Sequence, residues 1–354
     1  MTPIQTQDYS IQFNDDCYTA LNKYINQHSF SNIFILVDSN TSEHCLPIFL
    51  RQLETDLTIE IIEIEAGEQN KTIETCSGVW QTLSELRADR KTLMLNLGGG
   101  VVTDLGGFVA CTYQRGIKFI NIPTTLLSMV DASIGGKNGV DLGNIKNQVG
   151  IIKTPNMVLI DTNYLETLSS REMRSGLAEM LKHGLIRDEL YYNKLSALSN
   201  LTLEDLDQLI YDSVLIKKDI VEQDPTEQNL RKSLNFGHTL GHAIESYYLN
   251  HETKSLLHGE AIAIGMILET YLSSQLLNFP TEKTKSIKEN TLKVYGKIDI
   301  PEKDYAPIIE LMKFDKKNEK GTINFVLLNT IGNPEINCVI PNDLLIKSLN
   351  FYNE

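Results

Sequence analysis

The chain has 354 residues, 42% of them hydrophobic, with 32 basic against 46 acidic side chains and a net charge of −14. This length can bury more than one core, so we expect two domains. The acidic balance argues against nucleic acid or an anionic membrane surface as the main partner. No apolar run approaches the roughly 20 residues that span a bilayer, and the first residues lack a secretion signal, so we expect a cytoplasmic protein acting on small molecules.

The first half of the chain alternates short apolar runs with helix-length segments. Runs of strand length separated in this way are typical of βαβ units, so we predict an α/β domain with a mostly parallel sheet over residues 1–167. The predicted strands are Ile33–Val37, Ile59–Ile64, Thr92–Leu97, Lys118–Ile122 and Asn156–Ile160.

A glycine-rich stretch, "LGGGVVTDLGG", follows the third of these strands and opens a predicted helix. Backbone N–H groups and the helix dipole at such a place can hold a pyrophosphate. The spacing does not satisfy G-x-G-x-x-G, and an acid, Asp38, ends an earlier strand instead. This pattern predicts a nucleotide site in which the acidic residue comes before the glycine turn in the chain and not after it. The alternative is that the glycines form a tight turn and Asp38 only ends its strand.

Polar and basic residues cluster between residues 123 and 150. A Thr-Thr pair follows a strand, Asp131 comes next, a glycine turn precedes Lys137, and Lys146-Asn147 follows. Lysines beside glycines suit phosphate or carboxylate ligands because the backbone there can approach closely. With Arg115 the group predicts an anion-binding site; the alternative is a set of solvated surface lysines.

Beyond residue 167 the apolar residues recur at three- and four-residue spacing, so we predict an all-α domain over residues 168–354. One short strand is expected at Thr322–Leu328. The five scattered cysteines form no CxxC pair, which disfavours a disulfide framework or a zinc ribbon.

Histidines in this half suggest a metal. His238 and His242 are four residues apart and share one face of a helix, and His258 follows in "LLHGE". Two imidazoles and a carboxylate suit zinc or Fe(II), and the carboxylate could come from three glutamates. They are Glu179, Glu245 and Glu260. The spacing allows both His238 and His242 to be ligands, and it equally allows ordinary hydrogen-bonded histidines.

Taken in order, several motifs resemble the 3-dehydroquinate synthase family, within the sugar phosphate cyclases, along nearly the whole chain. The motifs are "GGGVVTDLGGFVA", "YQRGIKFINIPTTLLSMVDASIGGKNGVD", "IKNQVG", "GLAEMLKHG", "RKSLNFGHTLGHAIE", "LHGEAIAIGM" and "DKKNEKG". Two positions depart from the family: Thr103 stands where glycine is usual, and Asn138 where threonine or valine is commoner. The resemblance implies a phosphate-eliminating lyase of the shikimate pathway that forms a homodimer and uses NAD and a divalent metal, Zn²⁺ or Co²⁺.

The resemblance also implies the roles of individual residues. It places metal ligands at Glu179, His238 and His258, and proton transfer or catalysis at His242, Glu227 and Lys137. NAD contacts fall on Asp38, Asn40, Glu68, Lys71, Gly99, Gly100, Asp104, Thr124, Thr125 and Lys146. Substrate contacts fall on Arg115, Asp131, Lys137, Asn147, Lys182, Lys217, Arg231, Asn235 and Lys316.

The implied reaction converts 3-deoxy-D-arabino-heptulosonate 7-phosphate to 3-dehydroquinate. It proceeds by transient oxidation with NAD, phosphate elimination, reduction and intramolecular aldol closure. Three alternatives remain at this point: a cyclase that makes a valiolone or deoxy-inosose product, a metal-dependent polyol dehydrogenase, and a non-catalytic metal-stabilised binding protein. His242 and the "DASIGGK" segment favour dehydroquinate synthase among the cyclases.

Overall fold

The computed structural model describes residues 1–143, 145–197, 203–249, 255–312 and 323–354. The chain folds into two compact units, Met1–Ser169 and Ser170–Glu354, which we describe separately. Among the described helices, none combines the length and the apolar character that a membrane crossing needs.

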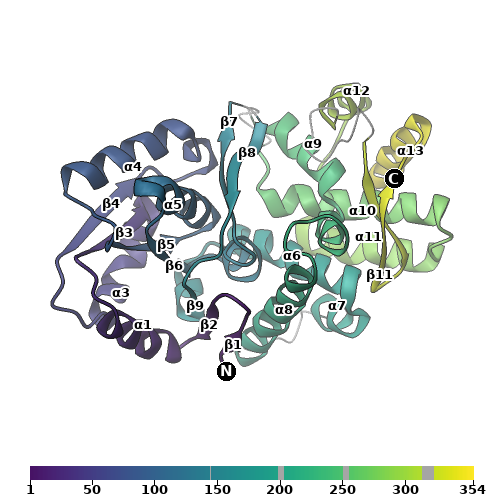
Figure 1. Cartoon of the computed structure of the whole chain (residues 1–354). Helices are drawn as coiled ribbons and strands as arrows, with labels where there is room; N and C mark the ends of the chain where they lie inside the picture. Colours follow the sequence, from purple (N-terminus) through teal and green to yellow (C-terminus); the bar gives the residue numbers. More distant parts are fainter. Residues whose placement is uncertain (144, 198–202, 250–254, 313–322) are drawn as a thin grey trace. The chain divides into compact units, whose positions relative to one another are not determined.

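A seven-stranded sheet forms the centre of the first unit (Figure 1). All neighbouring strands are parallel except the β1–β2 pair at one edge. In spatial order the strands are β1 (Ile4–Gln5), β2 (Ser10–Phe13), β9 (Met157–Ile160), β6 (Lys118–Pro123), β5 (Leu93–Gly98), β3 (Ile33–Asp38) and β4 (Ile59–Ile64). The five predicted strands are therefore confirmed, as is the mostly parallel sheet.

The strand order contains a reversal beside β3. From β3 the chain passes to β4 on one side, and then returns to β5 on the other side of β3. Loops that leave the carboxyl ends of β3 and β5 consequently diverge, and in open α/β sheets such a switch point is where ligands bind. Asp38 and Gly98 are the last residues of these two strands.

Helices cover both faces of this sheet. They are α1 (Asp16–Gln27), α2 (Ser39–His44), α3 (Leu46–Gln52), α4 (Ile73–Glu85) and α5 (Gly100–Thr112). Leu83 of α4 and Val109 of α5 share one buried cluster with Phe34 and Met94 of the sheet. Figure 1 shows α1 and α3 on the opposite side from α4 and α5. This two-sided burial explains why a central strand such as β3 is a continuous apolar run and not an alternating one.

An unpredicted hairpin also belongs to the first unit. It consists of β7 (Lys137–Leu142) and β8 (Ile145–Ile152), and β7 packs against α5. The amide of Asn138 holds the base of the hairpin, donating to the carbonyl oxygens of Gly136 at 3.0 Å and Lys153 at 2.7 Å. Lys137, Lys146 and Asn147 all lie on these two strands.

The second unit is helical. Its helices are α6 (Ser170–Arg187), α7 (Glu189–Ser196), α8 (Leu203–Gln223), α9 (His238–Tyr248), α10 (His258–Leu276), α11 (Thr281–Tyr295), α12 (Glu302–Leu311) and α13 (Asn342–Asn353). One antiparallel hairpin, β10 (Phe325–Thr330) with β11 (Asn333–Cys338), is added to them. The helical prediction is confirmed with that addition; β10 is the strand expected near the C-terminus, and β11 was not predicted.

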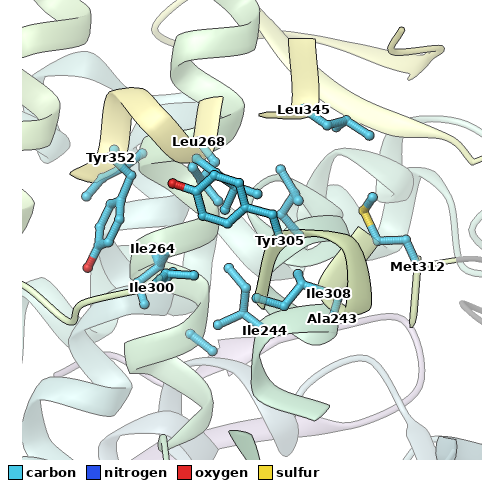
Figure 2. Close-up of a cluster of buried hydrophobic side chains, with 14 of the residues drawn as sticks. Ala243, Ile244, Ile264, Leu268, Ile300, Tyr305, Ile308, Met312, Leu345 and Tyr352 are labelled. Atoms are coloured by element: carbon cyan, nitrogen blue, oxygen red, sulfur yellow. The ribbon is translucent and has the colours of Figure 1, made fainter. Parts of the chain in front are cut away.

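Helix α10 is the centre of the second unit. It is apolar on all sides, which is typical of a helix buried all round, and it packs against α6, α9, α11, α13 and β10. Figure 2 shows Ile264 and Leu268 of α10 in the buried cluster with Ile244 of α9, Tyr305 of α12 and Tyr352 of α13. The two helices that begin with predicted metal ligands, α9 and α10, are thereby fixed against each other.

Candidate functional site

Helix α5 begins at the glycine stretch, directly after β5. Gly99 is its N-cap and Gly100 its first residue. A Cβ on Gly98 would lie 2.6 Å from the Val102 side chain, and a Cβ on Gly99 would lie 3.0 Å from Cγ2 of Thr125. A side chain at either position would therefore crowd its neighbours, and the helix N-terminus lies at the switch point of the sheet, where a phosphate can bind to backbone N–H groups.

Three of the residues predicted to contact NAD end the strands beside this turn. Asp38 ends β3 and caps α2, where its Oδ1 accepts the Thr41 N–H at 2.8 Å. Thr124 and Thr125 follow β6, and the Thr124 N–H donates to the Gly98 carbonyl at 3.0 Å. Because β3, β5 and β6 are parallel neighbours, these residues gather at one edge of the sheet. Asn40, also predicted to contact NAD, is exposed on α2.

A buried lysine lies at the centre of a second group. Lys71 is 4% exposed, and its Nζ donates to Asp104 Oδ2 and to Asn147 Oδ1, both at 2.7 Å. Burial alone would lower the pKa of Lys71, but the carboxylates of Asp104 and Glu68 outweigh it and raise that pKa above its ordinary value. Lys71 is therefore held as a cation beside the N-terminal half of α5.

The hairpin joins this group. Lys146 Nζ lies 3.4 Å from Glu68 Oε1, and the Asn147 N–H donates to Asp141 Oδ1 at 2.6 Å. The structure thus brings together Glu68, Lys71, Asp104 and Lys146, all predicted NAD contacts, with Asn147, predicted for the substrate. Asp141 was missed. Its position in a glycine-rich segment gave no signal, since the carboxylate acts by fixing the backbone of Asn147, whose φ is +50°.

The two departures from the family pattern have structural roles. Thr103 is buried, and its hydroxyl donates back to the carbonyl oxygens of Gly99 at 3.2 Å and Gly100 at 3.3 Å. Asn138 Oδ1 lies against Gly107 of α5, where a Cβ would come within 2.0 Å of it. The Thr103 hydroxyl therefore bonds the backbone of its own helix. Asn138 packs the hairpin closely against α5.

Three more residues of the first unit were predicted to contact the substrate. Arg115 is exposed and follows the C-terminus of α5, a helix about 20 Å long whose other end carries the glycine turn. Asp131 lies in a short helical segment, Ser128–Ala132, and Lys137 is exposed at the start of β7. Their roles toward a substrate stay predictions.

In the second unit, Glu179 of α6 meets two of the histidines. It is fully buried, and its Oε1 lies 3.5 Å from Nε2 of His238 and 3.5 Å from Nε2 of His258. Two ligand atoms about 2.1 Å from a tetrahedral ion stand about 3.4 Å apart, so this spacing fits a zinc-sized cation. The other carboxylate oxygen, Oε2, pairs with Lys182 one turn along the helix.

The remaining ring nitrogens of both histidines have partners that orient the rings. His238 Nδ1 donates to the Phe236 carbonyl at 3.1 Å, and His258 Nδ1 lies 3.3 Å from Glu245 Oε2. A hydrogen on Nδ1 leaves Nε2 as the coordinating atom, which is how metal-binding histidines are usually held. The donor set is therefore prepared for a cation.

Of the three candidate carboxylates, Glu179 alone faces both Nε2 atoms. Glu245 contacts the opposite nitrogen of His258. Glu260 accepts the Leu257 N–H at 2.9 Å and hydrogen bonds from Nε and Nη2 of Arg171 at 2.8 and 2.7 Å, so it stabilises the start of α10.

His242 leaves a choice of ligands open. Nitrogen atoms of His238, His242 and His258 all lie within 4.8 Å of one another, and the His238 and His242 ring centroids are 5.1 Å apart. A set of three histidines is therefore compatible with the geometry, as the helical spacing indicated. The alternative set of Glu179, His238 and His258 is supported by the two equal distances of 3.5 Å from Glu179 Oε1 to the histidine Nε2 atoms.

A close contact between helices places His258 beside Glu179. The N–H of Gly259 donates to Ser175 Oγ at 3.0 Å, and a Cβ on Gly259 would lie 2.0 Å from the Ser175 carbonyl oxygen. Ser175 is one turn before Glu179 on α6. Glycine after His258 therefore lets the start of α10 lie directly on the helix that carries the carboxylate.

Three cationic side chains are buried in α6 and in two elements that pack against it. Lys182, Lys217 and Arg231 are 1%, 6% and 1% exposed, on α6, on α8 and in the segment Leu230–Asn235. These three elements pack against one another. Asn235 Nδ2 donates to Glu227 Oε1 at 2.8 Å, which joins two more predicted residues. Lys316 lies outside the described residues.

We predict that the affinity for Zn²⁺ depends on pH. Burial lowers the pKa of His258, but Glu245 and Glu179 outweigh it and raise the pKa to about 9 in the metal-free protein. The ring is then protonated at pH 7 and must lose that proton to coordinate, so affinity should rise roughly tenfold from pH 7 to pH 8. Competition with a chelator calibrated at each pH measures this; equal affinities at the two pH values would contradict it.

Family models and curated relatives match most of the chain. Residues 61–175 match the family described as 3-dehydroquinate synthase N-terminal, and residues 176–318 match 3-dehydroquinate synthase C-terminal. A 3-dehydroquinate synthase of Parabacteroides distasonis is 41% identical over 341 residues, covering 96% of each chain. One of Clostridium beijerinckii is 38% identical over 313 residues, covering 85% of this chain and 86% of the relative.

Solved structures share the fold at lower identity. A 2-deoxy-scyllo-inosose synthase, solved with carbaglucose-6-phosphate, NAD⁺ and Co²⁺, has a TM-score of 0.85 at 24% identity and covers 99% of both chains. A 2-epi-5-epi-valiolone synthase from Streptomyces hygroscopicus, solved with NAD⁺ and Zn²⁺, has a TM-score of 0.86 at 23% identity, covering 100% of this chain and 99% of that one. An iron-containing alcohol dehydrogenase has a TM-score of 0.68 at 15% identity, with 99% of both chains covered.

Proposed function

Because the chain belongs to the 3-dehydroquinate synthase family, and so is an enzyme, we propose that it converts 3-deoxy-D-arabino-heptulosonate 7-phosphate to 3-dehydroquinate and phosphate. In this proposal it is an NAD- and metal-dependent lyase of the shikimate pathway, and it acts as a cytoplasmic homodimer. The observation that carries the proposal is Glu179 Oε1, which lies 3.5 Å from two histidine Nε2 atoms on helices packed beside buried cations.

The residues present fit both cofactors. Glu179, His238 and His258 would hold Zn²⁺ or Co²⁺, since the two distances from Glu179 Oε1 to the histidine Nε2 atoms suit a tetrahedral ion and each Nδ1 atom has a partner of its own. For NAD, the glycine turn leaves the N-terminus of α5 open at the switch point. Bound NAD would supply a reversible hydride acceptor, and the metal ion a Lewis acid for the substrate's hydroxyl groups.

We assign the NAD site to residues at the carboxyl edge of the sheet. Asp38, at the end of β3, would accept from ribose hydroxyls, while Gly99 and Gly100 would receive the pyrophosphate. The remaining contacts are Asn40, Glu68, Lys71, Asp104, Thr124, Thr125 and Lys146. Lys71 and Asp104 would act chiefly by holding the hairpin against the N-terminal half of α5, since Lys71 bonds both Asp104 and Asn147.

Buried cations of the second unit would bind the substrate's two anionic groups. Lys182 pairs with Glu179, so its ammonium lies at the metal centre. Arg231 is anchored by its backbone N–H to Asp224 at 3.0 Å and by Nη1 to the Pro225 carbonyl at 2.7 Å. A guanidinium fixed in this way offers directed donors to a phosphate or carboxylate. Lys217, Asn235, Arg115, Asp131, Lys137, Asn147 and Lys316 complete the proposed substrate contacts.

Proton transfer is assigned to His242 and Glu227. His242 lies one helical turn from His238, and its nitrogen can receive the proton of a hydroxyl bound at the metal centre without leaving α9. Glu227 shares a hydrogen bond with Asn235, which would keep its carboxylate directed toward the substrate's contacts.

The proposal is tested by substrate choice. Phosphate release should be fast with 3-deoxy-D-arabino-heptulosonate 7-phosphate and absent with sedoheptulose 7-phosphate or glucose 6-phosphate, when each is supplied with NAD and Zn²⁺. Comparable turnover of either sugar phosphate would assign the chain to a valiolone or deoxy-inosose type of cyclase, whose fold it shares. Stoichiometric NADH formation without phosphate release would favour a dehydrogenase instead.

A further inference from the structure

Glu269 is a fully buried acid in the apolar helix α10. Its Oε2 accepts the Gly237 N–H at 2.6 Å, and its Oε1 accepts the N–H groups of Thr239 at 3.2 Å and Leu240 at 3.4 Å. A buried carboxylate is costly unless its oxygens are satisfied, and here backbone donors at the start of α9 satisfy both. The shortest of the three bonds is to Gly237, which precedes the helix.

That shortest bond leads to the metal centre through one peptide group. The Gly237 N–H and the Phe236 carbonyl belong to the same peptide unit, and this carbonyl accepts the Nδ1 hydrogen of His238 at 3.1 Å. On the far side of the ring, His238 Nε2 faces Glu179 Oε1. A continuous path therefore runs from the Glu269 carboxylate through a peptide bond and an imidazole to the proposed metal.

We propose that Glu269 is a positioning residue for His238, and that it acts through the 236–237 peptide to fix the tautomer, orientation and donor strength of this metal ligand. The inference rests on the metal role given to His238 above. It identifies an outer contact of the metal site that comes from a different helix and reaches the histidine through a backbone peptide.

Two physical effects support the proposal. A carboxylate bonded to the N–H polarises the peptide, which makes the Phe236 carbonyl a better acceptor for Nδ1–H and the opposite nitrogen a better donor to a metal. The carboxylate also fixes the plane of this peptide, because it binds the N–H while the His238 ring binds the carbonyl. Gly237 has a φ of +78°, and a Cβ on Gly265 would lie 1.9 Å from the Gly237 carbonyl oxygen, so the two helices are in backbone contact there.

The test compares Glu269→Gln with a matched control, Asp304→Asn. Asp304 is also a buried carboxylate bonded to α9, but at the other end, where it accepts from the hydroxyls of Tyr247 and Tyr248 at 2.9 Å. Each substitution keeps the side-chain size and replaces one acceptor oxygen by an NH₂ group. Both variants should lose stability, which makes the loss of stability uninformative by itself.

Metal affinity and the spectrum of bound Co²⁺ separate the two roles. We expect Glu269→Gln to weaken Zn²⁺ binding by roughly 10–100-fold, the usual effect of losing an outer contact of a ligand, and to alter the visible absorption bands of Co²⁺. Asp304→Asn should keep both within about twofold of the wild type. If Glu269→Gln binds Zn²⁺ like the wild type and leaves the Co²⁺ spectrum unchanged, Glu269 is only a helix cap and the inference is wrong.

Two further measurements test the inference if the wild type binds no metal or if Glu269→Gln does not fold. In the metal-free full chain, ¹⁵N spectra of His238 should show a protonated Nδ1 in the wild type and a mixture of tautomers in Glu269→Gln; identical spectra would overturn the inference. This readout still applies if the wild type binds no metal, an outcome that would instead sink the proposed function. Should Glu269→Gln fail to fold, Glu269→Asp, which shortens the side chain, must weaken Zn²⁺ binding, and wild-type affinity in that variant would refute the proposal.

Discussion

Replacing His238 with alanine should abolish metal binding, and activity should fall with it. Glu179 and His258 would then be the only remaining members of the matched set, since Glu179 Oε1 lies 3.5 Å from each histidine in the intact site. Two ligands do not hold zinc as three do. Metal content after dialysis, measured by inductively coupled plasma spectrometry, checks this result directly.

His242→Ala is the matched comparison, on the same face of α9 one turn away. If His242 transfers a proton, this variant should keep near-stoichiometric metal and NAD while phosphate release slows by roughly 10²–10⁴-fold. Loss of metal from His242→Ala with retention in His238→Ala would reverse the two roles. Loss of metal from both variants would indicate that His238, His242 and His258 together are the ligands. The geometry also allows this set, because nitrogen atoms of the three rings lie within 4.8 Å of one another.

Asp104→Asn should destabilise the first unit and weaken NAD binding. The change leaves Lys71 buried without its principal counter-charge, because the Lys71–Asp104 pair is 2.7 Å long with side chains 5% and 16% exposed. Removing one partner of a buried ion pair typically costs about 3–5 kcal/mol. Lys71 also bonds Asn147, so the hairpin should lose its attachment to α5 at the same time.

Urea unfolding followed by tryptophan fluorescence measures the loss of stability in the first unit. The chain has one tryptophan, Trp80, on α4 of the first unit, where it packs against the core beside Phe108. Asp343→Asn, which breaks an exposed pair with Lys347 in the second unit, should leave the transition unchanged. A midpoint in Asp104→Asn equal to that of the wild type would show that the pair is not stabilising, and calorimetric titration with NAD tests the accompanying loss of affinity.

Apolar patterning was sufficient to predict the central strands and the helical second unit. Buried parallel strands such as Ile33–Asp38 are continuous apolar runs, and α10 is apolar all round, so both can be recognised without knowing their neighbours. The β7–β8 hairpin could not be recognised. Its strands contain glycines and polar residues, only Val140 and Val149 join the buried cluster, and hydrogen bonds of Asn138 and Asp141 hold it as well.

Some residues of the candidate site could be predicted from the sequence, and others could not. Helical spacing identified His238 and His242 as neighbours, but the choice of Glu179 over Glu245 and Glu260 depends on how α6, α9 and α10 pack, which no local pattern encodes. Glu269 carried one weak signal, an acid inside the apolar run "IAIGMILETYL". A charge in such a run indicates a buried partner, but only the fold shows that this partner is the peptide behind His238.

The most direct test of the account is the amount of phosphate released per molecule of NAD. With Zn²⁺-loaded enzyme, 3-deoxy-D-arabino-heptulosonate 7-phosphate in large excess and NAD present only in trace amount, phosphate should appear far beyond the NAD supplied, without NADH accumulating at 340 nm. Such a result requires that the hydride be returned in each turnover, as a transient oxidation demands. Phosphate release that stops at one equivalent of NAD, with matching NADH, would contradict it.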